Sequence, residues 1–217
     1  MLADSKAVPG IIKDVKVLNF LKRFFDIVCS ALALIVFSPV IGIIALVVYI
    51  DDGSPVFFRQ DRVGTGNKLF KIRKFRTMKV GTRTAATAEL VESDSQITKS
   101  GKFLRKTSLD ELPQLINIFE GTMSFVGPRP LIPEESEIRR LREEYGVYTV
   151  RPGVTGWAQI NGRDNISIEE KANLDKEYIE KHSLWFDFMI LLKTVVVVLK
   201  RENISEGSET GKKRKRH

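Results

Sequence analysis

Two adjacent carboxylates, Asp110 and Glu111, are the residues of this chain best suited to catalysis. They follow two cationic side chains, Arg105 and Lys106, along the chain. A carboxylate pair among fixed cations suits chemistry on an anionic phosphate, because one acid can attack while the other holds a divalent metal ion. The same segment also fits a helix-capping box, in which Ser108 pairs with Glu111 at a helix start. The two interpretations are compatible, and capping is the commoner role for such a local pattern.

Further candidate cations lie on a predicted strand and in a predicted stiff turn. The segment 69–78 alternates apolar and basic residues, which is typical of a half-buried strand. This strand would direct Lys74 or Arg76 toward solvent or toward a phosphate site, where either could bind oxygen atoms. The Gly-Pro-Arg-Pro turn at 127–130 is non-helical and would hold Arg129 with little freedom.

Two later turns also carry arginines. The segment 151–157 contains Arg151 and ends in Trp157, and the next turn, Asn-Gly-Arg, ends in Arg163. An indole ring could stack on a nucleotide base or fill the core, and core filling is the commoner role. Trp157 and Arg151 are therefore candidates for a substrate pocket, with a structural role as the alternative for the tryptophan.

The composition indicates one main domain and makes several classes of site improbable. The 217 residues carry a formal charge of +8, and five of the positive charges lie between Lys212 and Arg216. The remainder is only mildly basic, which argues against a nucleic-acid partner and leaves anionic lipid or nucleotide partners open. A single cysteine excludes an internal disulfide, and two histidines make a zinc site improbable.

An uncharged apolar run from Ile27 to Ile50 is long enough to be a transmembrane candidate. Ser38-Pro39 falls in its middle, where proline should kink or break a helix. Each half would then be about 12 residues, or about 18 Å long, which is short of a hydrocarbon core of about 30 Å. Basic residues flank both ends, so charge does not orient a full span. A kinked spanning helix and a re-entrant hairpin fit these residues equally well.

From residue 51 onward the pattern predicts a compact, helix-rich α/β domain. Short strands and a hairpin turn are expected first, followed by a helix that carries the acid pair and by a charged, solvated helix. These elements are expected at 56–58, 61–67, 69–78, 109–119 and 133–145. Two amphipathic stretches, 11–25 and 185–193, could lie on a membrane surface, and the second could equally close the core.

The order of the longer motifs is more specific than any motif alone. They are Lys-Phe-Arg-Thr-Met (74–78), Ser-Leu-Asp-Glu-Leu-Pro-Gln-Leu (108–115), Met-Ser-Phe-Val-Gly-Pro-Arg-Pro (123–130), Arg-Pro-Gly-Val-Thr-Gly-Trp-Ala-Gln (151–159) and Asn-Gly-Arg (161–163). Preceded by an apolar segment interrupted at Ser-Pro, this series closely resembles the bacterial sugar transferase family, the monotopic phosphoglycosyl transferases. The resemblance covers roughly residues 20–204 and corresponds to the small form of the family, without additional N-terminal membrane helices.

The resemblance implies an α-rich α/β monotopic membrane protein and favours the hairpin over the full span. The implied organisation is a leader (1–19), a re-entrant membrane helix broken at Ser38-Pro39 (20–50), a catalytic domain (51–205) and a disordered basic tail (206–217). The expected location is the bacterial inner membrane, with the catalytic domain on the cytoplasmic face. A homodimer is compatible with the sequence, which contains no feature that requires one.

The resemblance also implies a reaction: transfer of a sugar 1-phosphate from a UDP-sugar to a polyprenyl phosphate such as undecaprenyl phosphate, with release of UMP. This is the first membrane step in the assembly of a bacterial glycan. On this pattern Asp110 attacks the donor, giving an aspartyl phosphosugar intermediate, and Glu111 ligates Mg²⁺. Phosphate oxygens would be bound by Arg105, Arg129 and Arg163, with Lys74 or Arg76.

Three other functions remain as alternatives. A membrane-tethered scaffold would depend neither on Asp110 nor on a divalent metal ion. A transferase for a CDP-linked alcohol would use the same carboxylates and magnesium but would release CMP. A membrane-anchored nucleic-acid binder would need a recognisable binding motif, which the sequence lacks.

Overall fold

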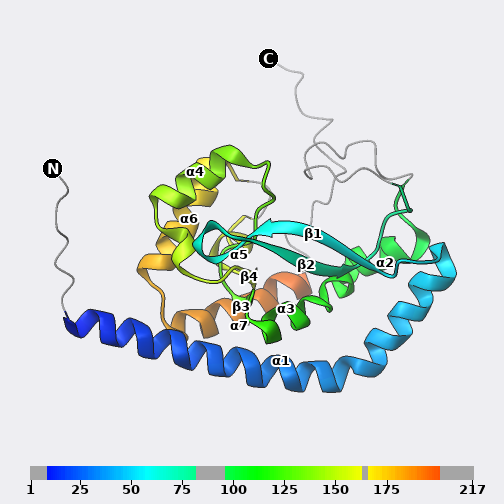
Figure 1. Cartoon of the computed structure of the whole chain (residues 1–217), viewed down its shortest axis with the longest axis horizontal. Helices are drawn as coiled ribbons and strands as arrows, with labels where there is room; N and C mark the ends of the chain where they lie inside the picture. Colours follow the sequence, from blue (N-terminus) through cyan, green and yellow to red (C-terminus); the bar gives the residue numbers. More distant parts are fainter. Residues whose placement is uncertain (1–8, 82–95, 163–165, 201–217) are drawn as a thin grey trace, which may run out of the picture.

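The structure, a computed structural model, describes residues 9–81, 96–162 and 166–200. It confirms a helix-rich α/β architecture with a long apolar N-terminal helix (Figure 1). That helix, α1 (Pro9–Asp52), runs along one side of the molecule, and the other elements lie above it in the view of Figure 1. Arg163 falls outside the described residues, as does the basic tail.

Helix α1 continues through Pro39, so the expected interruption at Ser38-Pro39 is absent; the helix bends instead (Figure 1). Pro39 has no N–H to donate to the carbonyl of Ile35 one turn earlier. The Ser38 hydroxyl donates to that same carbonyl at 2.8 Å. This bond satisfies the carbonyl that Pro39 leaves without a backbone donor, while the helix continues as the bent form that a proline allows.

Helix α1 is long and apolar enough to cross a membrane over Val17–Asp52, by length and composition alone. Most of its large apolar side chains are exposed, including Phe20, Phe24 and Ile50. Only near its C-terminal end does it contribute to the core, where Ile44 and Val48 are buried. The surface of α1 that faces away from the rest of the protein is therefore apolar.

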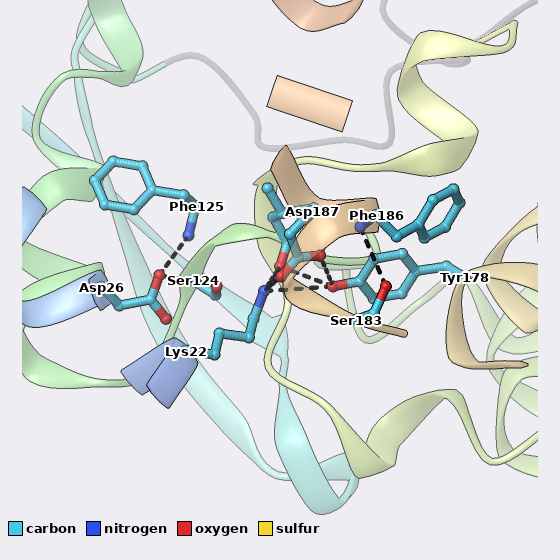
Figure 2. Close-up of polar contacts among 9 residues, drawn as sticks. Lys22, Asp26, Ser124, Phe125, Tyr178, Ser183, Phe186 and Asp187 are labelled. Carbon is cyan, nitrogen blue, oxygen red and sulfur yellow. Dashed lines mark hydrogen bonds and ion pairs between the residues drawn. The ribbon is translucent and has the colours of Figure 1, made fainter. Parts of the chain in front are cut away.

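Two charged residues of α1, Lys22 and Asp26, face the protein instead (Figure 2). Lys22 Nζ forms an ion pair with the Asp187 carboxylate and donates to the Val126 carbonyl at 2.9 Å. The Tyr178 hydroxyl donates to Asp187 Oδ1 at 2.7 Å. Burial, followed by the nearby Asp187 charge, raises the Tyr178 pKa well above its usual range, so the hydroxyl stays a donor.

Asp26 joins α1 to the strand that contains Val126. Asp26 Oδ1 accepts from the Ser124 hydroxyl at 3.1 Å and from the Phe125 amide at 3.2 Å (Figure 2). All three residues of β3 (Ser124–Val126) are thus bonded to α1 through Lys22 or Asp26. These bonds attach the first half of α1 to the α/β part. The predicted boundary between a membrane segment and a catalytic domain near residue 50 stays a prediction.

Two small sheets carry the expected strands. Strands β1 (Phe57–Val63) and β2 (Leu69–Phe75) form an antiparallel hairpin in which Phe57 pairs with Phe75, across a turn that includes η1 (Thr65–Asn67). This confirms the predicted hairpin, although β1 extends to Val63 and shortens its turn. Strand β2 ends at Phe75, so Arg76 lies beyond it.

The second sheet pairs β3 in parallel with β4 (Gly153–Thr155). The chain approaches itself closely at this point. A Cβ atom on Gly127 would lie 2.3 Å from the Arg151 carbonyl oxygen, and one on Gly153 would lie 2.1 Å from the Gly127 nitrogen. Glycine at both positions allows the 127–130 turn to pack directly on the 151–156 segment.

The acid pair does not lie in one continuous helix, as the prediction for 109–119 had it. It lies in a single 3₁₀ turn, η4 (Leu109–Glu111), and the helix α3 begins only at Gln114 and ends at Glu120. Pro113 precedes α3, where its missing N–H is tolerated. The capping prediction is also wrong, because Ser108 has a φ of 56° and its side chain makes no capping bond.

The remaining helices complete the α/β part. They are α2 (Lys99–Thr107), α4 (Ser136–Glu144), η5 (Val147–Thr149), α5 (Trp157–Ile160), α6 (Ile168–Glu180) and α7 (Leu184–Lys200). Helix α4 was expected to be solvated, yet Ile138 and Arg142 are buried against its neighbours. Helix α7 contributes Ile190 to the core, while Trp185 is exposed, and a position on a membrane surface stays a prediction.

Candidate active site

One small cleft, open to solvent, brings several predicted residues together. It lies where the β1–β2 hairpin, η4, α3 and the 127–130 turn meet. Its lining combines three cations and one carboxylate with uncharged groups: Arg62, Ile72, Lys74, Glu111, Gln114, Arg129, Pro130, Gly153 and Val154. The cleft is therefore mainly cationic and suits an anionic ligand.

Glu111 and Lys74 face each other across this cleft. Lys74 Nζ lies 2.7 Å from Glu111 Oε1, and each side chain is about one fifth exposed. The pair brings β2 to the 3₁₀ turn that carries the acids. The expected placement of Lys74 beside the carboxylate pair is thus realised in the structure.

Asp110 precedes Glu111 in η4 and is 8% exposed. The short turn separates two roles in space, because Glu111 lines the cleft while Asp110 is the more deeply enclosed of the two. Adjacent side chains of a 3₁₀ turn leave it about 120° apart, because the turn has three residues. One carboxylate is therefore directed at the cleft and its neighbour is held close to the protein.

The 127–130 turn is held from two sides by arginines. Arg142 Nη1 donates to the Arg129 carbonyl at 2.7 Å, and Arg142 is itself paired with Asp175 at 2.6 Å in the core. Arg62 Nη1 donates to the Pro130 carbonyl at 3.2 Å. The predicted stiffness of this turn is thus reinforced by contacts far along the chain.

The Arg142–Asp175 pair is almost fully buried, with side chains 2% and 1% exposed. Burial is the largest influence on Asp175 and raises its pKa, and the Arg142 guanidinium opposes this rise. A buried pair of this kind gives little net stability but specifies one arrangement of the groups it joins. Here it fixes the backbone that presents Arg129 to the cleft.

Arg62 is a cleft residue that the sequence motifs do not identify. It is the second-last residue of β1, and its guanidinium lies beside Arg129 and Glu111 in the cleft lining. Burial, with the like charge of Arg129, lowers its pKa to about 10, and Glu135 and Glu111 oppose the fall. The sequence pattern places Arg62 within the expected turn at 61–67, and the strand β1 that holds it extends further than expected.

Three predicted phosphate or substrate ligands are bonded elsewhere in the structure. Arg76 is buried, and its Nη2 donates to the carbonyls of Asp52 and Gly53 at 2.7 and 2.9 Å. Arg105 Nε donates to Thr77 Oγ1 at 2.9 Å, and Arg151 Nε donates to the Gly121 carbonyl at 3.0 Å. None of these three side chains lines the cleft.

Trp157 also lies outside the cleft lining, in a packed cluster. Its Nε1 donates to Glu177 Oε2 at 2.8 Å, and its ring contacts Phe186 with centroids 5.0 Å apart. Lys193 Nζ lies 4.9 Å above the same ring. Of the two roles considered for Trp157, these contacts favour core filling.

The described residues contain no group of three or more histidine, cysteine, aspartate or glutamate side chains that would form a metal cage. Mg²⁺ does not require such a cage, because it is often bound by one or two carboxylates together with the phosphates of a substrate. Glu111 is the carboxylate of the pair that lines the cleft. It is thus the side chain best placed to contribute a ligand.

Comparison with known proteins identifies the family. The family model for bacterial sugar transferases matches residues 17–201, which is most of the chain. The chain belongs to the bacterial sugar transferase family. This assignment confirms the resemblance carried by the ordered motifs, and the matched region includes α1 from Val17 onward together with the entire cleft.

Individual relatives include proteins with named activities. UDP-glucose:undecaprenyl-phosphate glucose-1-phosphate transferase of Escherichia coli is 45% identical over 184 residues, covering 82% of this chain and 40% of the relative. Undecaprenyl-phosphate galactose phosphotransferase of Salmonella typhimurium is 40% identical over 205 residues, covering 85% and 41%. The chain thus spans about two fifths of the length of these relatives.

A shorter relative matches almost end to end. An uncharacterized sugar transferase of Bacillus subtilis, EpsL, is 43% identical over 190 residues, covering 86% of this chain and 91% of the relative. The conserved unit therefore also occurs as most of a protein close to this chain in size.

Proposed function

We propose that this protein transfers a sugar 1-phosphate from a UDP-sugar to undecaprenyl phosphate or a similar polyprenyl phosphate, releasing UMP. The names of the Escherichia coli and Salmonella relatives support the donor and acceptor classes. The observation that carries the proposal is the cleft itself, in which Glu111 of the acid pair on η4 meets Lys74, Arg62 and Arg129. Three cations around one carboxylate suit a diphosphate substrate.

In the proposed mechanism Asp110 is the nucleophile. An oxygen of its carboxylate forms a bond to the β-phosphorus of the donor, while the bond from that phosphorus to the bridging oxygen breaks and UMP leaves. The acceptor phosphate then attacks the same phosphorus, the aspartyl bond breaks and Asp110 is regenerated. Two displacement steps of this kind divide one transfer between two anions into two easier ones.

Glu111 would hold Mg²⁺, which when bound would neutralise charge that develops on the phosphate oxygens. Arg129, on the turn held by Arg142, would bind a phosphate oxygen with its planar guanidinium. Lys74 would contribute a point charge from β2 while holding Glu111 in position. These cations lie on different elements, so the cleft would form only in the folded α/β part.

The apolar surface of α1 supports a membrane location for the site. A polyprenyl phosphate keeps its charged head at the interface, and an enzyme acting on it needs its cleft at that depth. We propose that α1 enters and leaves the inner membrane on the cytoplasmic side, with its bend providing the turn. Release of the lipid-linked sugar phosphate would then begin assembly of a bacterial glycan at that face.

The reaction can be tested with purified protein in nanodiscs containing Mg²⁺, undecaprenyl phosphate and a panel of UDP-sugars. We expect multiple-turnover UMP release that requires the lipid and one donor. Asp110→Asn should lower the rate by at least about a thousandfold, because loss of a catalytic nucleophile removes the covalent route. Glu120→Gln, which removes an exposed acid at the far end of α3, should leave the rate unchanged.

Different outcomes distinguish the alternatives. Release of CMP from a CDP-linked donor, with no UMP from any UDP-sugar, would favour the alcohol transferase. UMP release at the wild-type rate by Asp110→Asn would contradict the covalent mechanism while leaving the overall reaction intact.

A further inference from the structure

The hydrogen bonds of Arg62 do not neutralise its positive charge. Its Nη2 donates to the side-chain oxygen of Gln60 at 2.7 Å, and its Nη1 donates to the Pro130 carbonyl at 3.2 Å. Its Nε is buried and has no hydrogen-bond partner. Both of its hydrogen-bond acceptors are neutral oxygens, so these bonds leave the guanidinium charge without a paired carboxylate.

This arrangement differs from that of the arginines that are buried in the described chain, whereas Arg62 is half-buried with its Nε fully enclosed. Arg142 is paired with Asp175 at 2.6 Å, and Arg76 lies 3.2 Å from an Asp52 carboxylate oxygen. No ion pair joins Arg62 to a carboxylate among the residues that the structure describes. A buried charge without a counter-charge is costly, and such groups are normally paired or bind a ligand.

The neighbours of Arg62 increase this cost. Burial lowers the pKa of Arg62 most, the like charge of Arg129 on the same cleft lowers it further, and the charges of Glu135, Glu111 and Glu134 oppose this fall without forming an ion pair. The nearest cleft carboxylate, Glu111, is bonded to Lys74 instead. Two guanidinium groups on one cleft, one of them with a buried N–H that no acceptor uses, form a site for an anion with several oxygens.

We propose that Arg62 is a substrate ligand that binds phosphate oxygens together with Arg129. The proposal rests on the function proposed above and adds a binding residue from β1 that no motif indicated. Bound phosphate would supply the missing counter-charge to both guanidinium groups at once. Through its bond to the Pro130 carbonyl, Arg62 would also couple binding to the position of the turn that carries Arg129.

The phosphate could belong to the nucleotide donor or to the lipid acceptor, and separate measurements distinguish the two. UDP and inorganic pyrophosphate serve as soluble probes of the donor position, with their affinities measured by calorimetry in the presence of Mg²⁺. The KM for undecaprenyl phosphate probes the acceptor position. Both are measured on the full chain in nanodiscs.

The variants are Arg62→Gln and the matched control Arg59→Gln, which removes the same charge from an exposed position on the same strand. We expect Arg62→Gln to weaken binding of UDP and pyrophosphate at least about tenfold, in line with the energy of a charged hydrogen bond. An unchanged UDP affinity with a tenfold higher KM for the lipid would instead assign the phosphate to the acceptor. Arg59→Gln should change neither.

The variant Arg62→Lys tests whether a positive charge alone is sufficient or whether the planar guanidinium group is required. It retains the cation and should recover only part of the affinity, since an ammonium group cannot reproduce the paired N–H geometry. It also serves as the test variant if Arg62→Gln does not fold. Wild-type affinities and KM values in the folded Arg62 variants would overturn the proposal, whether or not the wild type releases UMP. Absence of UMP release with normal Arg62-dependent pyrophosphate binding would contradict only the proposed reaction.

Discussion

At the residue scale, the ion pair between Lys74 and Glu111 sets the conditions for metal binding. Glu111 already has a cation 2.7 Å away, so a metal ion at this carboxylate would share it with, or displace, the ammonium group. Mg²⁺ holds its water ligands strongly and usually binds through few carboxylates and substrate phosphates. We therefore expect tight metal binding only with the nucleotide donor present.

The corresponding prediction concerns Glu111→Gln, which keeps the size of the side chain and removes its charge. The Mg²⁺ concentration for half-maximal UMP release should rise at least about tenfold. Glu120→Gln, used as a control, should show the wild-type metal dependence. A metal titration of activity measures both, and an unaltered Mg²⁺ dependence in Glu111→Gln would remove this residue from the metal site.

Sequence motifs located part of the cleft and misplaced the rest for identifiable reasons. Lys74 and Arg129 line the cleft as expected, because a strand and a proline-flanked turn constrain their positions strongly. Arg76 does not, since β2 ends at Phe75 and the chain beyond it returns to Asp52 at the end of α1. Strand alternation cannot reveal where a strand stops, and Arg62 becomes a candidate only when long-range packing is known.

At the scale of elements, α1 is attached to β3 by charges rather than by apolar packing. The charged groups at this attachment are each less than 10% exposed. Lys22 and Asp26 bond directly to β3, and Asp187 pairs with Lys22. Strand β3 leads directly into the 127–130 turn, so the position of α1 is transmitted to the turn that carries Arg129. The sequence pattern suggested an amphipathic segment here but could not show that its polar side faces protein.

This attachment predicts a large effect from one substitution. Lys22→Met would leave the buried Asp187 carboxylate without its partner, which typically costs about 3–5 kcal/mol. Thermal unfolding monitored by circular dichroism should show a lowered midpoint. Lys22→Met combined with Asp187→Leu should recover most of the loss, because an apolar pair of similar volume avoids the unpaired charge. The exposed control Lys102→Met should unfold like the wild type, and equal midpoints for Lys22→Met and wild type would contradict this account.

The acid segment shows what local patterns miss at this scale. Ser108-x-x-Glu111 matches a capping box, yet Ser108 has left-handed backbone geometry and ends α2 rather than starting a helix. Pro113 then delays α3, which leaves the acids on their own 3₁₀ turn. Helix existence was predictable from the apolar pattern, whereas this division depended on the turn geometry between two helices.

At the scale of the whole molecule, exposed apolar side chains occur along α1 and also on α7. Exposed apolar residues on α7 include Trp185, Leu192 and Val195. A soluble protein rarely exposes contiguous apolar surface of this kind, and large exposed patches mark membrane or protein contacts. Together with the basic residues on both sides of the apolar run, this surface supports a protein that rests on the membrane with α1 inserted.

The topology follows as a prediction. If α1 enters and leaves on the cytoplasmic side, a tag at either terminus should be inaccessible to an impermeant label applied outside the cell. Both tags should become labelled after the membrane is permeabilised. A membrane protein with a known external terminus serves as the labelling control. Labelling of an N-terminal tag on intact cells would establish a full span and contradict the hairpin.

The central claim, that Asp110 carries the sugar phosphate during transfer, is tested most directly by mass spectrometry. Protein mixed with Mg²⁺ and the active UDP-sugar, without polyprenyl phosphate, would be quenched and digested. We predict one added sugar phosphate on the peptide that contains Asp110, and its loss when the lipid acceptor is supplied before quenching. An unmodified Asp110 peptide from protein that has released one equivalent of UMP in the same mixture would contradict the claim.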